Sequence, residues 1–326
     1  MRYSRQEIFR EIGKKGQSKL EKSIVAIIGL GALGSVSSEL SARAGIGHLI
    51  LIDRDVVELS NLQRQSLFTE KDVGKPKALA AKEHLSNINS KAEIDFFIDD
   101  LNFENVDRIL SNKINLILDC TDNLETRFLI NDYSIKNKIP FIYSSAVGSK
   151  GYVFDIMPET TPCLKCFLKE AAQLDTCETT GVLNSITHLI SSIQTDEAIK
   201  ILLEKNYEKD LLFFDVWKNE LTKIKVNKNK NCICCVKNNF EYLSGKKSSR
   251  IAKLCGDNVY QIKSKTIGKS QFNSLKNSLR KIGNVADFGY CISFDGKLTI
   301  FQNGRALIKA KDEKEAKSLY SKFVGN

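Results

Sequence analysis

Residues 24–34 read Ile24-Val25-Ala26-Ile27-Ile28-Gly29-Leu30-Gly31-Ala32-Leu33-Gly34, a short apolar run that leads into three glycines. An uncharged run of this length predicts a buried parallel strand, and the glycines after it predict a tight turn. Residues 35–44 have helical character, and His48–Asp53 read as a second strand. Strand, glycine turn, helix and strand together predict a βαβ unit.

The rest of the chain first repeats this alternation and then departs from it. Strands are expected at 94–98, 114–119 and 140–145, and helices near 75–85 and 125–137. This alternation predicts an α/β fold with a Rossmann-like, doubly wound sheet. After Gly148, strands at 151–156 and 221–226 flank a helix near 184–203. We expect these two strands to form an antiparallel extension, which makes the sheet mixed.

A polar stretch, Ser244–Ser249, predicts a linker to a second domain. Beyond it we expect a strand, a helix at about 272–282, a hairpin that turns at Asp295-Gly296 and a last helix from about Asp312. Asp-Gly between apolar strands is a strong hairpin signal. The sequence therefore predicts two domains, one over residues 1–238 and a small α+β domain over 250–326.

Basic residues are concentrated near the C-terminus. Residues 240–326 hold 17 Lys and Arg against 7 Asp and Glu, which accounts for the net charge of +10 of the whole chain. Such a surface favours an acidic protein or a nucleic acid as partner, and a solvated lysine-rich surface is the alternative. The N-terminal residues show no secretory signal, and no apolar run reaches the length of a membrane span. We therefore expect a cytoplasmic protein without a membrane partner.

The glycine turn predicts a nucleotide site. In a G-x-G-x-x-G turn, Gly29, Gly31 and Gly34 let the backbone approach a phosphate, and the following helix offers free N–H groups at its N-terminus. Asp53 ends the next strand, where a carboxylate can bind ribose hydroxyls. These features alone favour an NAD-dependent oxidoreductase, and a glycine turn that serves packing only is the alternative.

The segments that follow the turn favour phosphoryl chemistry instead. Arg64 and Lys77 lie in short polar stretches after the second strand. Hydride transfer does not need such cations, whereas they would neutralise the charge that spreads over phosphate oxygens in a transition state. Asp122 follows another strand at the carboxyl edge of the sheet, where its carboxylate could hold Mg²⁺.

The chain has nine cysteines, an odd number that argues for metal or thiol chemistry rather than a disulfide framework. Cys163 with Cys166 and Cys232 with Cys235 form two C-x-x-C pairs. Four thiolates would make a closed tetrahedral Zn²⁺ site, which is structural because no position stays open for water. Cys234 leaves the choice of ligand open. Two unrelated buried pairs and a zinc-based nucleic-acid binder are the alternatives.

At this point the chain resembles the ThiF/MoeB/HesA adenylyltransferases, relatives of the ubiquitin-activating enzymes. The resemblance covers about residues 1–238, and a weaker one extends to 301–306 and 318–320. The stretches that carry it are Arg2–Gln6, the glycine turn, Ser60–Gln65, Gly74–Lys77, Asp119–Asn123, the two cysteine pairs, Gly181-Val182, Gln194 and Glu197–Lys200.

The resemblance implies ATP-dependent adenylation of the C-terminal glycine carboxylate of a ubiquitin-like sulfur-carrier protein that ends in Gly-Gly. Pyrophosphate is released, and the carrier becomes ready for sulfur transfer or conjugation. An α-carboxyl with a pKa near 3.5 is already ionised, so catalysis depends on positioning and charge neutralisation rather than on a general base. The implied nucleotide contacts are Arg64 and Lys77 to the phosphates, Asp122 to Mg²⁺ and Asp53 to the ribose, with Asn61 and Asn123 beside them.

The resemblance also implies partners. Arg5 would reach into the site of a neighbouring subunit, which requires a homodimer, and the four paired cysteines would close one structural Zn²⁺ site. Cys177 aligns with a cysteine that bonds covalently to the carrier in some relatives, with a sulfur donor as a further partner. Asp175 and Glu178 beside it would not lower the pKa of that thiol, so adenylation without a thiol step is the alternative.

The sequence departs from the family at a few positions. Ala32 stands where glycine is commonest, and Thr180–Ser185 with His188 replace a glycine- and proline-rich helix start. These bulkier residues affect which carrier tail can enter, and His188 itself reads as a packed or capping side chain. The rival functions are an NAD-dependent oxidoreductase, a tRNA-modifying dehydratase of the same superfamily and a non-catalytic scaffold that binds a ubiquitin-like protein.

Overall fold

The computed structural model describes residues 2–110, 113–168, 180–247, 259–263 and 268–324. The chain divides into two compact units. The first comprises Met1–Val73 and Lys77–Ser248, and the second comprises Ser249–Asn326 with Gly74–Pro76. Among the helices in these ranges, none is long and apolar enough to cross a membrane.

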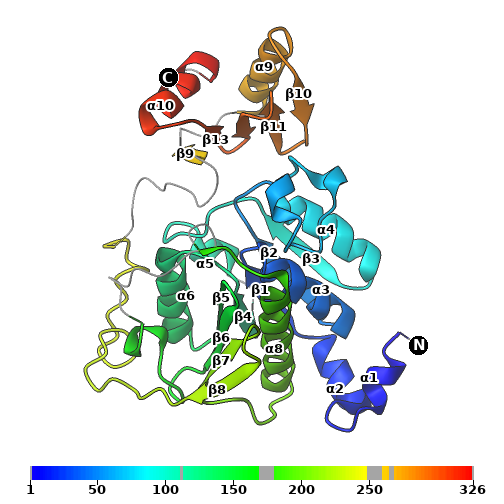
Figure 1. Cartoon of the computed structure of the whole chain (residues 1–326), viewed down its shortest axis with the longest axis vertical. Helices are drawn as coiled ribbons and strands as arrows, with labels where there is room; N and C mark the ends of the chain where they lie inside the picture. The colour runs from blue at the N-terminus through cyan, green and yellow to red at the C-terminus, as the bar shows by residue number, and fades with distance from the viewer. Residues whose placement is uncertain (1, 111–112, 169–179, 248–258, 264–267, 325–326) are drawn as a thin grey trace. The chain divides into compact units, whose positions relative to one another are not determined.

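The first unit is built on an eight-stranded mixed sheet with the order β3-β2-β1-β4-β5-β6-β7-β8 (Figure 1). The parallel strands are β1 (Ile24–Ile28), β2 (His48–Ile52), β3 (Glu93–Phe97), β4 (Leu116–Asp119) and β5 (Phe141–Val147). The antiparallel ones are β6 (Lys150–Ile156), β7 (Leu211–Asp215) and β8 (Glu220–Ile224). The order of the parallel strands is that of a doubly wound fold, which confirms the predicted fold class. β7 adds to the predicted strands and lies between the two expected for the extension.

Helices cover both faces of this sheet. α3 (Gly34–Ala44), α4 (Lys77–Ile88) and α8 (Asn184–Leu202) pack on one face, and α5 (Val106–Ile109) and α6 (Leu124–Asn137) pack on the other (Figure 1). Successive residues of β1 enter the two cores in turn: Val25 and Ile27 face α3, whereas Ala26 and Ile28 face the opposite core. A strand that is buried on both faces must be apolar throughout, which is why residues 24–28 carry no polar side chain.

The first unit also has elements that the sequence pattern did not indicate. Two short helices, α1 (Ser4–Ile8) and α2 (Gly13–Leu20), precede β1, and 3₁₀ helices lie at Leu59–Asn61, Glu70–Asp72 and Leu164–Cys166. The stretch expected as a linker is not extended where the structure describes it, because residues 240–247 form hydrogen-bonded turns. In these turns the amides of Ser244 and Gly245 donate to the carbonyls of Phe240 and Tyr242. The described part of the stretch therefore belongs to the first unit.

The second unit has a five-stranded antiparallel sheet with the order β10-β11-β12-β13-β9. Its elements are β9 (Val259–Lys263), α9 (Lys269–Arg280), β10 (Val285–Asp287), β11 (Cys291–Phe294), β12 (Leu298–Phe301), β13 (Arg305–Lys309) and α10 (Glu313–Phe323). Asp295 and Gly296 connect β11 and β12 with φ angles of 49° and 64°, which confirms the predicted hairpin. The Asp312 carboxylate accepts a hydrogen bond from the Glu315 amide at 2.8 Å and begins the predicted last helix.

Candidate active site

The glycine turn lies between β1 and α3, and each of its three glycines meets a different environment. A Cβ atom on Gly34 would lie 1.8 Å from the carbonyl oxygen of Gly29, so the helix can begin this close to the strand only with glycine. Gly29 has a φ of 85°, and a Cβ there would lie 2.7 Å from the Cys120 carbonyl oxygen. Gly31 is open, since the nearest atom to its Cβ would be the Gln65 amide nitrogen at 3.8 Å. The turn therefore leaves room for a ligand above Gly31, as phosphate binding requires.

Asp53 ties the end of β2 to the glycine turn. Its Oδ2 accepts a hydrogen bond from the Leu30 amide at 2.6 Å, and its Oδ1 accepts one from the Asp55 amide at 2.7 Å. Burial raises the pKa of Asp53 above its usual value, while the positive charge of Lys77 opposes that shift. The carboxylate thus lies directly beside the turn, in the place where the sequence predicted a ribose ligand.

Lys77, which is buried, and Arg54, which is partly buried, bring two cations to this edge of the sheet. Lys77 begins α4, its Nζ lies 3.6 Å from Asp55 Oδ2, and its amide donates to the Asp55 carbonyl at 2.9 Å. Burial opposes its charge, but the carboxylates of Asp53 and Asp55 outweigh it and raise the pKa of Lys77. Arg54 Nη1 donates to Asp100 Oδ1 at 3.0 Å. Both side chains therefore stay protonated and can neutralise the negative charge of a polyphosphate.

Asp122 and Asn123 lie where β4 passes into α6. Asn123 caps the helix, because its Oδ1 accepts a hydrogen bond from the Thr126 amide at 2.8 Å. Asp122 is exposed, and its negative charge contributes to raising the pKa of Lys77 and Arg54. The structure therefore brings Asp122 to the same side of the site as the two cations. The helix cap uses one lone pair of the Asn123 side-chain oxygen, which leaves the other lone pair and the amide NH₂ for other contacts.

The turn that carries Asp122 is held by a buried arginine. The Arg127 guanidinium, one helical turn into α6, donates to the carbonyl oxygens of Thr121 and Ser144 and lies 3.7 Å from the Asp119 carboxylate. Asp119 in turn accepts hydrogen bonds from the Thr121 amide and hydroxyl. The sequence pattern does not indicate a role for Arg127, because nothing in it separates this residue from a surface arginine of a helix. Arg54 could have been found, since it directly follows Asp53, the predicted ribose ligand.

The remaining predicted nucleotide ligands lie around the 3₁₀ helix after β2. Arg64 is half-buried and donates through Nη1 to the Ser60 carbonyl at 3.0 Å. Asn61 is buried, and its Oδ1 accepts a hydrogen bond from the Glu58 amide at 3.2 Å. The direct role of Asn61 in the fold is thus to order the 58–61 turn.

Arg5 is not part of this cluster within its own chain. It is exposed on α1, and α1 is fixed to the C-terminal end of α3 because Gln6 Nε2 donates to the Ala44 carbonyl at 2.8 Å. The glycine turn lies at the other end of α3, about 16 Å away for a helix of this length. A role for Arg5 in nucleotide binding therefore requires a second subunit.

Four cysteines come together in the first unit, although 69 residues separate the two pairs. The Sγ atoms are 3.9 Å apart for Cys163 and Cys166, and 3.6 Å apart both for Cys163 and Cys232 and for Cys166 and Cys235. A tetrahedron of thiolates about 2.3 Å from a zinc ion has edges of about 3.8 Å, whereas a disulfide needs about 2.05 Å. The donor set and its spacing fit Zn²⁺, and Cys234 lies outside this group.

The other cysteines and His188 have no such arrangement. Cys177 lies outside the described residues. Cys120 is buried, which raises the pKa of its thiol to about 12 and fits a packed residue at the strand end. His188 Nδ1 lies 2.8 Å from the Asn184 carbonyl oxygen of its own helix, as a local contact near the helix start.

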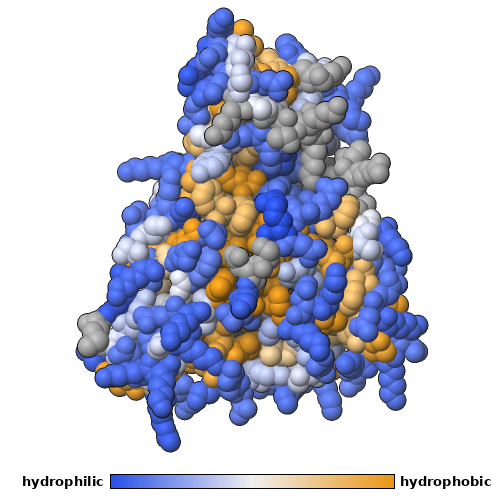
Figure 2. Space-filling view, turned by 180° about the vertical axis from the view of Figure 1, so that it is seen from behind, coloured by the Kyte–Doolittle hydropathy of each residue, from blue (hydrophilic) through white to orange (hydrophobic). Residues whose placement is uncertain are grey.

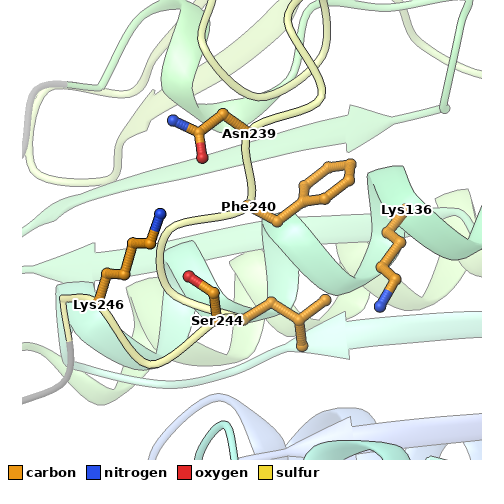
Figure 3. Close-up of a pocket in the computed structure, with 6 residues that line it drawn as sticks. Lys136, Asn239, Phe240, Ser244 and Lys246 are labelled. Atoms are coloured by element: carbon orange, nitrogen blue, oxygen red, sulfur yellow. The ribbon is translucent and has the colours of Figure 1, made fainter.

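A pocket of about 240 Å³ is lined by residues outside the glycine turn, and Figure 3 shows the side chains around it. It lies between the last turns of α6 and the segment that follows the late cysteine pair, and its lining residues are Lys136, Asn239, Phe240, Leu243, Ser244 and Lys246. None of the predicted nucleotide ligands lines it. The candidate active site is therefore the open edge at the glycine turn rather than this pocket.

The fold and the site define a class of protein: a doubly wound domain that places acidic and basic side chains around a glycine turn and brings four cysteines together at a spacing that fits a metal ion. Residues 3–235 match the ThiF family, and the chain belongs to that family. This confirms the resemblance seen in the sequence.

Known relatives agree with this assignment. The chain is 41% identical over 335 residues to the sulfur carrier protein ThiS adenylyltransferase of Bacillus subtilis, and the match covers 99% of each chain. It is 34% identical to the SAMP-activating enzyme E1 of Haloferax volcanii, over 72% of this chain and 88% of that one. Among solved structures, Escherichia coli MccB bound to a MccA derivative shares the fold, with a TM-score of 0.65 and 22% identity over 72% of this chain and 75% of that one.

Proposed function

We propose that this protein adenylates the C-terminal carboxylate of a ubiquitin-like sulfur-carrier protein at the expense of ATP. The observation that carries the proposal is the open glycine turn at Gly31 with Asp53, Lys77 and Asp122 around it, in a chain that matches a ThiS adenylyltransferase over its whole length. A nicotinamide-dependent oxidoreductase would not need the buried cation Lys77 at this edge.

The site's own groups account for the chemistry. The backbone above Gly31 and the N-terminus of α3 bind phosphate oxygens, and Asp53 orients the ribose. Lys77 and Arg64 neutralise the charge of the triphosphate while the carrier carboxylate attacks the α-phosphate and pyrophosphate leaves. Asp122 would hold Mg²⁺, which supplies further charge neutralisation when bound. Because the attacking carboxylate is already ionised, we assign no residue to proton abstraction.

The four-cysteine cluster would hold Zn²⁺ as a structural ion. Its thiols all come from the protein, so no coordination position is left for a substrate. We propose that the metal fixes the loops at residues 163–168 and 232–238 against α6. A bond between Cys177 and the carrier would belong to a separate step, which adenylation does not need.

Two surfaces of the first unit expose large apolar side chains that could contact protein partners. Large apolar side chains are exposed beside α1, at Ile8 and Phe9, and along the edge of the sheet, at Trp217, Leu221 and Ile224. On the face opposite to that of Figure 1, apolar patches also show between the hydrophilic side chains (Figure 2). We propose a homodimer, with the carrier as second partner and a sulfur donor acting on the adenylated product.

We also propose that residues 1–238 carry the adenylation activity and that residues 250–326 form an appended basic domain. The SAMP-activating enzyme matches 72% of this chain with 88% of its own length, so it has little chain left for a counterpart of the basic domain. An acidic partner, including a nucleic acid, remains a proposal for this domain.

The test is carrier-stimulated exchange of labelled pyrophosphate into ATP. We expect Lys77→Met to lower exchange at least about 100-fold, because a cation beside the phosphates is lost. Lys82→Met is the matched control: Lys82 lies on the same helix, but its ammonium lies over the Phe96 ring, 4.9 Å from the centroid. The proposal would be contradicted if Lys77→Met exchanged pyrophosphate as fast as Lys82→Met. It would also be contradicted if the wild-type protein bound NAD(H) and showed no exchange.

A further inference from the structure

α6 carries polar side chains in its buried interior that the nucleotide site does not use. Asn131 and Asp132 are both fully buried in the middle of the helix. Polar groups at such positions are normally kept only where each finds a partner. Both find their partners at and beside the two cysteine loops.

Asn131 contacts the loops of both cysteine pairs, although it touches none of the four clustered thiols. Its Oδ1 accepts a hydrogen bond from the Leu164 amide at 2.8 Å, and Leu164 lies between the first two cysteines. Its Nδ2 donates to the Sγ of Cys234 at 3.2 Å, next to the last ligand, Cys235. One side-chain amide thus spans two loops that are far apart in the sequence.

Asp132 contacts the first cysteine loop through an ion pair and the segment after the second loop through a hydrogen bond. Its Oδ1 lies 3.2 Å from the Nζ of Lys165, the other residue between Cys163 and Cys166. Its Oδ2 accepts a hydrogen bond from the Tyr242 amide at 2.9 Å, and the Lys165 ammonium lies 4.8 Å from the centre of the Tyr242 ring. The side chains of Asp132 and Lys165 are 0% and 4% exposed.

The buried ion pair of Asp132 and Lys165 is not explained by stability alone. Removing two charges from water costs several kcal/mol for each ion, and an apolar pair of similar size often gives an equally stable protein. What a buried ion pair does supply is one defined geometry, because any other leaves a charge without its partner. Here that geometry fixes the first cysteine loop and the segment after the second on one helix.

We propose that Asn131 and Asp132, with Lys165, are positioning residues of the metal site: they hold both cysteine loops at tetrahedral spacing before the ion binds. Partners of this kind outside the ligand set typically change metal affinity 10–100-fold. The proposal rests on the metal assignment of the four cysteines and not on the adenylation reaction, so metal measurements test it separately from pyrophosphate exchange.

The experiment strips the metal from the full-length protein and titrates it with Co²⁺ and Zn²⁺ in competition with a chromophoric chelator. We expect Asn131→Ala to weaken metal binding about 10–100-fold and to shift the visible bands of the Co²⁺–thiolate complex. Glu159→Gln is the control, because it breaks the Lys138–Glu159 pair at the C-terminal end of the same helix, where both side chains are 72% exposed. This variant should keep wild-type affinity and spectrum.

A second pair of variants separates positioning from general stability. Lys165→Met leaves the Asp132 charge buried alone, whereas Lys165→Met with Asp132→Asn removes both charges. We expect the double variant to recover the melting temperature of the apoprotein but not the metal affinity. Wild-type affinity in Asn131→Ala, or an affinity in the double variant that recovers together with its melting temperature, would overturn the proposal.

Discussion

At the scale of residues, the glycines of the turn have separate tasks that the motif alone does not distinguish. Gly34 is required by the fold, since a Cβ there would overlap the Gly29 carbonyl oxygen at 1.8 Å. Gly31 has open space above it, so packing does not require glycine there, and we propose that the approach of a ligand does. The two positions can therefore be tested against each other.

Gly34→Ala should destabilise the fold by at least about 2 kcal/mol, because the backbone has to move to accept the methyl group. Gly31→Ala should fold normally but weaken ATP binding about 10-fold or more, since its methyl group occupies the approach of the phosphates. Thermal unfolding together with nucleotide titration checks both. Similar stability for Gly34→Ala and wild type would show that the turn is less tightly packed than the structure indicates.

A second residue-scale feature lies in the extension of the sheet. Asp155 on β6 is buried and faces Glu197 on α8, which accepts hydrogen bonds from the Lys200 ammonium and the Glu208 amide. Burial raises the pKa of Asp155 to about 9, and the Glu197 carboxylate adds to the shift. The folded protein thus keeps a proton on Asp155 at neutral pH.

This proton makes stability depend on pH. The unfolded chain releases it near pH 3.8 and the folded protein near pH 9, so the folded state binds one more proton between these values. The stabilisation is complete below pH 3.8 and is lost as pH rises towards 9, at up to about 1.4 kcal/mol per pH unit. Asp155→Asn should flatten this dependence and make the variant more stable than wild type at pH 8. Unfolding in urea from pH 5 to 9 measures the effect, and parallel curves would refute it.

At the scale of elements, α6 contacts both the turn beside the candidate nucleotide site and the two cysteine loops. Its N-terminal residues, Asn123 and Arg127, order the turn before it, and Asn131 and Asp132 further along hold the cysteine loops. Each cysteine loop is a hydrogen-bonded turn: the Cys166 amide donates to the Cys163 carbonyl in the first, and the Asn238 amide donates to the Cys234 carbonyl in the second. These hydrogen bonds lie within each loop, whereas a metal ion held by all four cysteines would join the two loops to each other.

Metal removal should loosen these loops and leave the parallel sheet intact. We expect chelation to lower the melting temperature and to speed amide hydrogen exchange at residues 163–168 and 232–238. Amides of β1 and β4 in the centre of the sheet should keep their protection. Re-addition of Zn²⁺ is the control, and unchanged exchange at both loops after verified metal loss would contradict a structural role.

At the scale of the whole molecule, the position of Arg5 bears on oligomerisation. α1 is tied to the far end of α3 from the glycine turn, so Arg5 cannot complete the site of its own chain. If it completes that of a partner, the active form is a dimer with two-fold symmetry.

Mixing two inactive variants tests this arrangement. In a mixed dimer, the Lys77→Met subunit supplies Arg5 to the intact pocket of an Arg5→Ala subunit. Free exchange of subunits should then restore about a quarter of the sites, as random pairing predicts. Each variant alone should stay inactive in pyrophosphate exchange while it elutes as a dimer. Full activity of Arg5→Ala alone would rule out the shared site.

The sequence by itself determined the doubly wound sheet, the hairpin at Asp295-Gly296 and the family, because these follow from local patterns: apolar runs, glycine turns and motif order. It also named the four clustered cysteines, although only the fold could bring together pairs that lie 69 residues apart. Tertiary structure alone decided that Cys234 is not in the cluster, that Gly31 is the open glycine and that Arg127, Asn131 and Asp132 are buried. Burial of a polar side chain depends on what packs against its helix, and no local pattern encodes that neighbour.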